Sequence, residues 1–176
     1  DWAGYLAAEQ KAFAAVEANV SGALPPEDLA AFNRYDPASP VHPARFAQDF
    51  NRSYVLEPQG APAGAVVMLH GLTDAPYSMR HIGALYAARG FVAIVPRMPA
   101  HGTTPAALAE VGWQDWMAAT RLAMREARRR AGPGRPLHIV GFSNGGALAL
   151  KYALDALDDA ALPRADRLVL VSPMVG

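Results

Sequence analysis

The sequence contains no cysteine. This absence excludes disulfide bonds, a thiolate nucleophile and zinc sites built on thiolates, and it leaves the compartment open between cytoplasmic and exported. No apolar run approaches the length of about 18 residues that a membrane-spanning helix needs. The chain begins at Asp1 without an initiator Met or a signal-peptide pattern, which predicts a soluble protein with a processed or trimmed start.

Neither sign of charge is in excess. Lys plus Arg and Asp plus Glu number 16 each, so the sequence indicates no polyanionic partner and we expect no nucleic-acid binding. Hydrophobic residues make up 52% of the 176 residues and charged residues 18%. These proportions predict a folded domain with a core rather than a disordered chain.

The most informative segment is the pentapeptide Gly-Phe-Ser-Asn-Gly at residues 141–145, which follows the apolar run Leu137 to Val140. A Gly-x-Ser-x-Gly turn between a strand and a helix is so sharp that it strains the serine backbone and presents the hydroxyl outward. We therefore predict a nucleophile elbow in which Ser143 is the nucleophile and Gly141 and Gly145 relieve crowding. Alone, the pattern fits a glycine-rich turn in any α/β protein equally well.

A second apolar run, Ala65 to Leu69, ends in His70-Gly71-Leu72-Thr73 and predicts a buried strand that enters a loop. In enzymes with a nucleophile elbow, one backbone N–H comes from the residue after the serine, at a helix N-terminus, and one from the loop after an earlier strand. Here these residues are Asn144 and Leu72. Their N–H groups are the predicted oxyanion hole.

Strands and helices alternate along most of the chain. We expect strands at 54–56, 65–70, 91–95, 137–141 and 167–172, and helices at 77–89, 113–130 and 145–157. This alternation predicts an α/β fold with a mostly parallel sheet and helices on both faces. The site would lie at the carboxyl ends of the strands, and Leu72, Thr73 and Ser143 all follow such ends.

Residues 1–50 are expected to form an N-terminal helix and a proline-rich wrapping segment ahead of the sheet-forming residues 51–176. The helix at 2–20 would place these apolar residues near one face: Trp2, Tyr5, Leu6, Phe13, Val16 and Val20. We expect this helix to pack on the body of the protein, with Glu9 mostly on another face. A lid or a membrane-surface helix is the alternative.

The connector Ser21 to Pro43 carries Pro25, Pro26, Pro37, Pro40 and Pro43. Prolines at this density predict a wrapping segment with one short helix around Glu27 to Phe32.

Four motifs occur in the order in which α/β-hydrolases carry them. They are His70-Gly71-Leu72-Thr73, His101-Gly102-Thr103-Thr104-Pro105, Trp113-Gln114-Asp115-Trp116 and Gly141-Phe142-Ser143-Asn144-Gly145. From about Tyr54 to Gly176 the chain resembles this superfamily, and more narrowly the small bacterial carboxylesterases and monoacylglycerol lipases (serine aminopeptidase S33-like hydrolases). The resemblance implies a serine hydrolase that acts on small-molecule carboxylic esters, without metal or organic cofactor.

The resemblance also implies supporting roles for several residues. His70 and Gly71 would support the oxyanion loop, and we expect a structural role for His101 as well. Catalysis by His70 or His101 is the alternative. The spacing of Trp113 and Trp116 favours packing of a helix against the sheet, and lining of an acyl pocket is the alternative. Asp115 could cap that helix or brace the His101 loop.

Two departures from the family pattern stand out. Ala100 replaces the glycine usual before His-Gly, and we expect it to fit only if its backbone avoids a positive φ. The second departure is larger, because the base and acid that activate a serine follow it in this fold, in the order Asp or Glu, then His. All five histidines precede Ser143: His42, His70, His81, His101 and His138.

We therefore expect this chain to be the N-terminal portion of a longer hydrolase. A C-terminal segment or a second chain would supply the cap, further strands, the Asp and the His. Two alternatives stay open. One is a catalytically inactive hydrolase-fold binding module, and the other is a membrane-surface lipase or lipid-handling protein that uses the helix at 2–20.

Overall fold

The computed structural model describes residues 1–175. Its centre is a five-stranded sheet in the order β1-β3-β2-β4-β5. The strands are β1 (Tyr54–Leu56), β2 (Gly64–Leu69), β3 (Phe91–Val95), β4 (Leu137–Phe142) and β5 (Arg167–Val171). β1 pairs antiparallel with β3, and the other neighbours pair in parallel.

The middle of the sheet is buried on both faces because its strands are continuous apolar runs. All six residues of β2 are buried. In the register, Val67 lies between Ile94 of β3 and Ile139 of β4. The expected strands are therefore confirmed, each within one residue at its ends.

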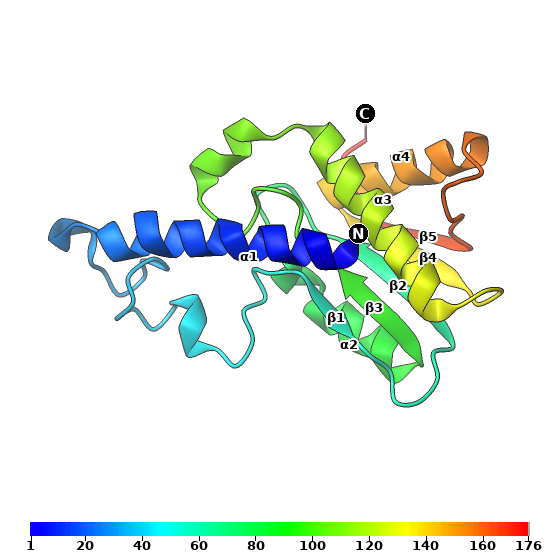
Figure 1. Cartoon of the computed structure of the whole chain (residues 1–176), viewed down its shortest axis with the longest axis horizontal. Coiled ribbons are helices and arrows are strands. Elements are labelled where there is room, and N and C mark those ends of the chain that lie inside the picture. Colours follow the sequence, from blue (N-terminus) through cyan, green and yellow to red (C-terminus); the bar gives the residue numbers. More distant parts are fainter. Residues whose placement is uncertain (176) are drawn as a thin grey trace.

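Helices cover both faces of the sheet, as Figure 1 shows. They are α1 (Trp2–Asn19), α2 (Arg80–Ala88), α3 (Trp113–Ala131) and α4 (Asn144–Asp158). Side chains of α3 and α4 pack on one face and form the larger core with alternate residues of the strands. Residues of α2 and of the preceding turn cover the other face, against Val66, Met68 and Val140. The predicted α/β fold with a mostly parallel sheet is confirmed.

The expected helix at 77–89 is divided in two. A 3-10 turn, η4 (Pro76–Met79), precedes α2. Pro76 is found at the first position of this turn, where its missing N–H costs nothing.

The expected short helix at 27–32 is wrong. The structure has only a 3-10 turn, η2 (Pro26–Asp28), after which Leu29 is extended. The exposed fractions of Leu29 and Phe32 are 52% and 87%, so no packed surface stabilises a further helical turn. Three other 3-10 turns occur among the described residues: η1 (Ser21–Ala23), η3 (Pro43–Arg45) and η5 (Pro105–Glu110).

Helix α1 contacts the body mainly through its first half, and its last turns extend beyond the sheet (Figure 1). Trp2 is buried in the larger core and stacks on Tyr5, with ring centroids 5.7 Å apart. Glu9, expected on an exposed face, is instead 5% exposed. Of the six apolar residues expected near one face, Trp2 is buried, Leu6 is exposed, and the others are partly buried: Tyr5, Phe13, Val16 and Val20.

Among residues 1–175, no helix combines the length and the apolar character needed to span a bilayer.

Candidate active site

Ser143 lies in the turn between β4 and α4, and its backbone is strained. Its φ of 52° and ψ of −117° place a non-glycine residue in the left-handed half of conformational space. The turn is held by backbone hydrogen bonds on both sides. The Ser143 N–H donates to the Val171 carbonyl at 3.0 Å, and the Ser143 carbonyl accepts from Met174 N at 3.0 Å and Gly146 N at 2.9 Å.

The glycines around Ser143 are required because other backbone atoms occupy the space of a side chain. A Cβ on Gly141 would lie 2.6 Å from Gly146 Cα, and one on Gly145 would lie 2.6 Å from the His70 carbonyl oxygen. Gly146 has the same constraint, with the backbone atom Pro173 Cα 2.9 Å from the position of a Cβ. Gly146 is absent from the predicted site residues, although the Gly-Gly pair after the serine is a visible signal for it.

The His-Gly loop after β2 packs directly against the serine turn. A Cβ on Gly71 would lie 3.4 Å from Ser143 Cβ and 3.2 Å from the Phe142 ring. Leu72 follows at once and is half-exposed. The structure thus brings together the two segments that the sequence predicted as parts of one site.

Asn144 is the first residue of α4. Its N–H is therefore among the groups for which a helix offers no internal acceptor. The Asn144 side chain is 5% exposed, and its Nδ2 atom finds no hydrogen-bond partner in the described part of the chain.

His70 links the serine loop to the loop after β3. Its Nδ1–H donates to the Gly71 carbonyl at 2.9 Å, and its Nε2 accepts from Met98 N at 3.0 Å. This pattern requires a neutral ring. Complete burial lowers the His70 pKa from 6.5 to about 4, so the ring is neutral at pH 7.

His101 is buried beside His70, with ring centroids 5.0 Å apart. Its Nδ1 contacts the Pro99 carbonyl at 3.1 Å, and Trp116 Nε1 donates to that same carbonyl at 3.2 Å. Burial lowers the His101 pKa as well. These contacts bind the ring into the loop after β3.

Ala100 adopts a φ of 66°, so the expectation that its backbone avoids a positive φ is wrong. A left-handed alanine costs about 1–2 kcal/mol. The surrounding loop compensates for this strain: the Ala100 carbonyl accepts from Thr103 Oγ1 at 2.6 Å, and the His101 N–H donates to the Met98 carbonyl at 3.1 Å.

The two tryptophans of α3 behave differently. Trp116 packs against the core and edge-on against His101, with ring centroids 5.3 Å apart. Trp113 is 50% exposed with Lys151 over its ring, so the expected core packing is wrong for this residue. Asp115 caps α3 by accepting from Gly112 N at 2.9 Å.

The other three histidines lie elsewhere, and His81 is exposed on α2. His42 accepts from Ala44 N at the start of η3, and His138 of β4 contacts the Tyr86 hydroxyl. Within residues 1–175, no histidine is hydrogen-bonded to Ser143. Nor does any group of three or more acidic or histidine side chains in this part of the chain form a place for a metal ion.

A strained serine between a parallel strand and a helix, with a His-Gly loop from a neighbouring strand packed on it, defines the class of α/β-hydrolases. Comparison with known families agrees: a sequence model described as the alpha/beta hydrolase fold matches residues 64–175. The chain belongs to this family, which confirms the resemblance carried by the four motifs. Residues 1–63 lie outside the match.

Several relatives are lipases and esterases by name. The thermostable monoacylglycerol lipase of Bacillus sp. (strain H-257) is 30% identical over 95 residues, which are 54% of this chain and 36% of the relative. A solved structure from work on the metagenome-derived lipolytic enzymes LipS and LipT is 28% identical with a TM-score of 0.61. That alignment covers 70% of this chain and 46% of the other.

A carboxyl esterase of Bacillus coagulans shares the fold, at 16% identity and a TM-score of 0.53, over 67% of this chain and 38% of its own. The present chain therefore spans less than half the length of these relatives.

Proposed function

We propose that this protein is a serine hydrolase that cleaves carboxylic esters through an acyl-enzyme on Ser143. The observation that carries the proposal is the strained Ser143 at the start of α4, with Gly71 packed against its Cβ. In this arrangement the N–H groups of Leu72 and Asn144 bind the oxyanion. The relatives that are lipases and esterases by name support the ester as substrate class.

The reaction runs in two halves. The Ser143 hydroxyl attacks the ester carbonyl carbon while a histidine accepts its proton, and the carbonyl oxygen becomes an oxyanion bound by the two N–H groups. The carbon–oxygen bond to the alcohol then breaks, and the histidine returns the proton to the departing alcohol. Water repeats the sequence on the acyl-enzyme, which releases the acid and restores the serine.

The histidine and the acid that orients it are part of this proposal, and we assign them to a segment outside the 176 residues. The exposed apolar side chains of β5 support the existence of such a segment. Leu168, Val169 and Val171 are each 37–40% exposed, although they form a strand with the apolar character of a buried one. A further strand beside β5 and a covering helix would bury these side chains.

The test is labelling of the full-length protein with a fluorophosphonate, which reacts with a serine only when a base has activated it. We expect peptide mass spectrometry to find the label on Ser143, and Ser143→Ala to remain unlabelled. The variant Ser172→Ala is the control, because Ser172 also has a positive φ but directly follows β5. It should be labelled like the wild type.

Folded protein that stays unlabelled would contradict the proposal. It would favour the inactive binding module instead.

A further inference from the structure

The N-terminal helix is joined to the loop after β3 by a buried ion pair. Arg97 follows β3, and its Nε lies 3.0 Å from Oε2 of Glu9 on α1. The side chains are 6% and 5% exposed. Burying two charges costs so much desolvation energy that such a pair adds little net stability over apolar residues of the same size. A gain in stability therefore does not explain why Glu9 and Arg97 form a buried pair here.

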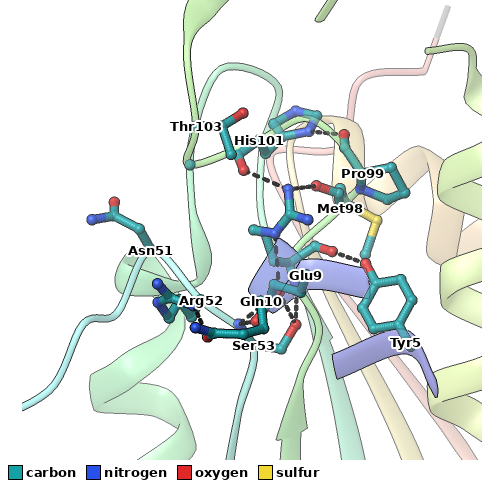
Figure 2. A network of polar contacts seen from close by, with 12 residues as sticks. Tyr5, Glu9, Gln10, Asn51, Arg52, Ser53, Met98, Pro99, His101 and Thr103 are labelled. Carbon is teal, nitrogen blue, oxygen red and sulfur yellow. Dashed lines mark hydrogen bonds and ion pairs between the residues drawn. The ribbon is translucent and has the colours of Figure 1, made fainter. Parts of the chain in front are cut away.

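The Glu9 carboxylate is fully engaged, as Figure 2 shows. It accepts from the Ser53 N–H at 3.1 Å and from the Ser53 hydroxyl at 2.8 Å. The same hydroxyl oxygen accepts from Arg97 N at 2.8 Å. Tyr5, one turn before Glu9, donates its hydroxyl to the Arg97 carbonyl. Burial raises the Tyr5 pKa, so this hydroxyl keeps its proton at neutral pH.

Arg97 in turn fixes the loop that follows it. Its Nη1 donates to the His101 carbonyl at 2.8 Å and reaches the Met98 carbonyl at 3.4 Å. Between these two carbonyls lies Ala100, whose φ of 66° is unfavourable for alanine. The Arg97 guanidinium therefore stabilises a turn in which Ala100 has an unfavourable backbone conformation.

From this loop the contacts continue to the candidate site. Met98 N donates to His70 Nε2, His70 Nδ1–H donates to the Gly71 carbonyl, and Gly71 packs on Ser143. Leu72, the proposed oxyanion donor, is the next residue. An unbroken series of polar contacts thus runs from Glu9 on α1 to the oxyanion loop.

We propose that Glu9 and Arg97 are positioning residues, which set the oxyanion loop through Met98 and His70. The inference rests on the proposed function. It means that α1, which lies outside the residues that match the family, affects the rate of catalysis. Loss of Glu9 leaves the Arg97 guanidinium buried without its counter-ion. The loop after β3 then relaxes, and the Leu72 N–H moves away from the position where negative charge develops.

The test is the rate of phosphonylation in the full-length variant Glu9→Gln. The matched control is Glu17→Gln, the same change at an exposed position of the same helix. Time courses followed by intact mass spectrometry give two quantities, the fraction of protein that reacts and the rate constant of that fraction. Unfolding lowers only the fraction, whereas a misplaced oxyanion donor lowers the rate constant.

We expect the saturating rate constant of Glu9→Gln to fall about tenfold or more, since loss of a whole oxyanion donor costs about 10²–10³-fold. The fluorophosphonate concentration that gives half of the saturating rate should stay nearly constant, because the oxyanion loop stabilises the transition state rather than the bound reagent. Glu17→Gln should match the wild type.

A second variant tests the inference even if Glu9→Gln does not fold. Glu9→Leu combined with Arg97→Met replaces the buried pair by apolar side chains, a change that often preserves stability. It should react to the wild-type extent with the lowered rate constant. An unchanged rate constant in Glu9→Gln or in the double variant would overturn the inference while leaving the proposed function intact. A wild-type protein that never reacts would overturn both.

Discussion

Ser143 can take its strained conformation only because glycine occupies the neighbouring positions. The Leu69 and His70 carbonyls lie where a Gly145 side chain would be, so the helix α4 approaches β2 through bare backbone. The glycine spacing in the sequence is therefore a packing requirement as well as a motif.

We predict that Gly145→Ala destabilises the protein by about 3 kcal/mol or more, because the obstructing atoms are backbone and cannot rotate away. The measurement is the free energy of unfolding in urea. Gly83→Ala in α2 is the control, since its nearest neighbour is the flexible Leu56 side chain at 3.2 Å. The control should change stability by at most about 1 kcal/mol. Equal effects of the two substitutions would contradict the packing argument.

His70 makes stability depend on pH. The unfolded chain binds a proton at this ring near pH 6.5, whereas the folded chain does so only near pH 4. Protonation therefore favours the unfolded state between these values, and stability is lost as the pH falls. For His70 alone the loss reaches about 3 kcal/mol at pH 4.

The measurement is the unfolding free energy from pH 7 to pH 4 in the wild type and in His70→Asn, whose amide does not titrate. We expect a shallower decline in the variant. His101, whose pKa is also lowered by burial, contributes with the same sign in both proteins. Parallel curves would show that His70 is not buried as a neutral ring.

Among the elements, α1 buries only two of its residues, Trp2 and Glu9. Its first turn enters the core through Trp2, and its middle is held by Glu9, while most of its surface remains exposed. This packing opposes the reading of α1 as a membrane-surface helix, because Trp2 and Tyr5, the residues suited to an interface, are engaged with the protein.

We predict that Trp2→Ala lowers the unfolding free energy by about 3–5 kcal/mol, the cost of a cavity left by a large aromatic. Leu6→Ala, on an exposed part of the same helix, should cost less than about 1 kcal/mol. Liposome co-sedimentation of both variants should equal that of the wild type. If Trp2→Ala instead reduced liposome binding and spared stability, the helix would be an anchor.

At the scale of the whole molecule, the sequence predicted the sheet well and the loops poorly. Strands such as Ala65 to Leu69 are recognisable because a buried parallel strand is apolar at every position. The candidate site was predictable for a similar reason, since glycine and serine at fixed spacing have a local geometric cause. The catalytic roles assigned to the site residues remain predictions, and so does the division of the chain into residues 1–50 and 51–176.

What the sequence did not predict depends on contacts between distant segments. Glu9 has the pattern of a solvated helix residue, and its burial is explained by Ser53 and by Arg97, which is 88 residues away. Ala100 is tolerated at a positive φ because Arg97 and Thr103 hold its turn. Local propensity carries no information about either contact.

Formation of an acyl-enzyme on Ser143 is tested most directly by intact mass spectrometry. The full-length protein would be mixed with p-nitrophenyl acetate and quenched in acid within the first turnovers. We predict a mass increase of one acetyl group, mapped to Ser143 and absent in Ser143→Ala. Ester hydrolysis without any adduct on Ser143, or with an equal adduct in the alanine variant, would contradict the account.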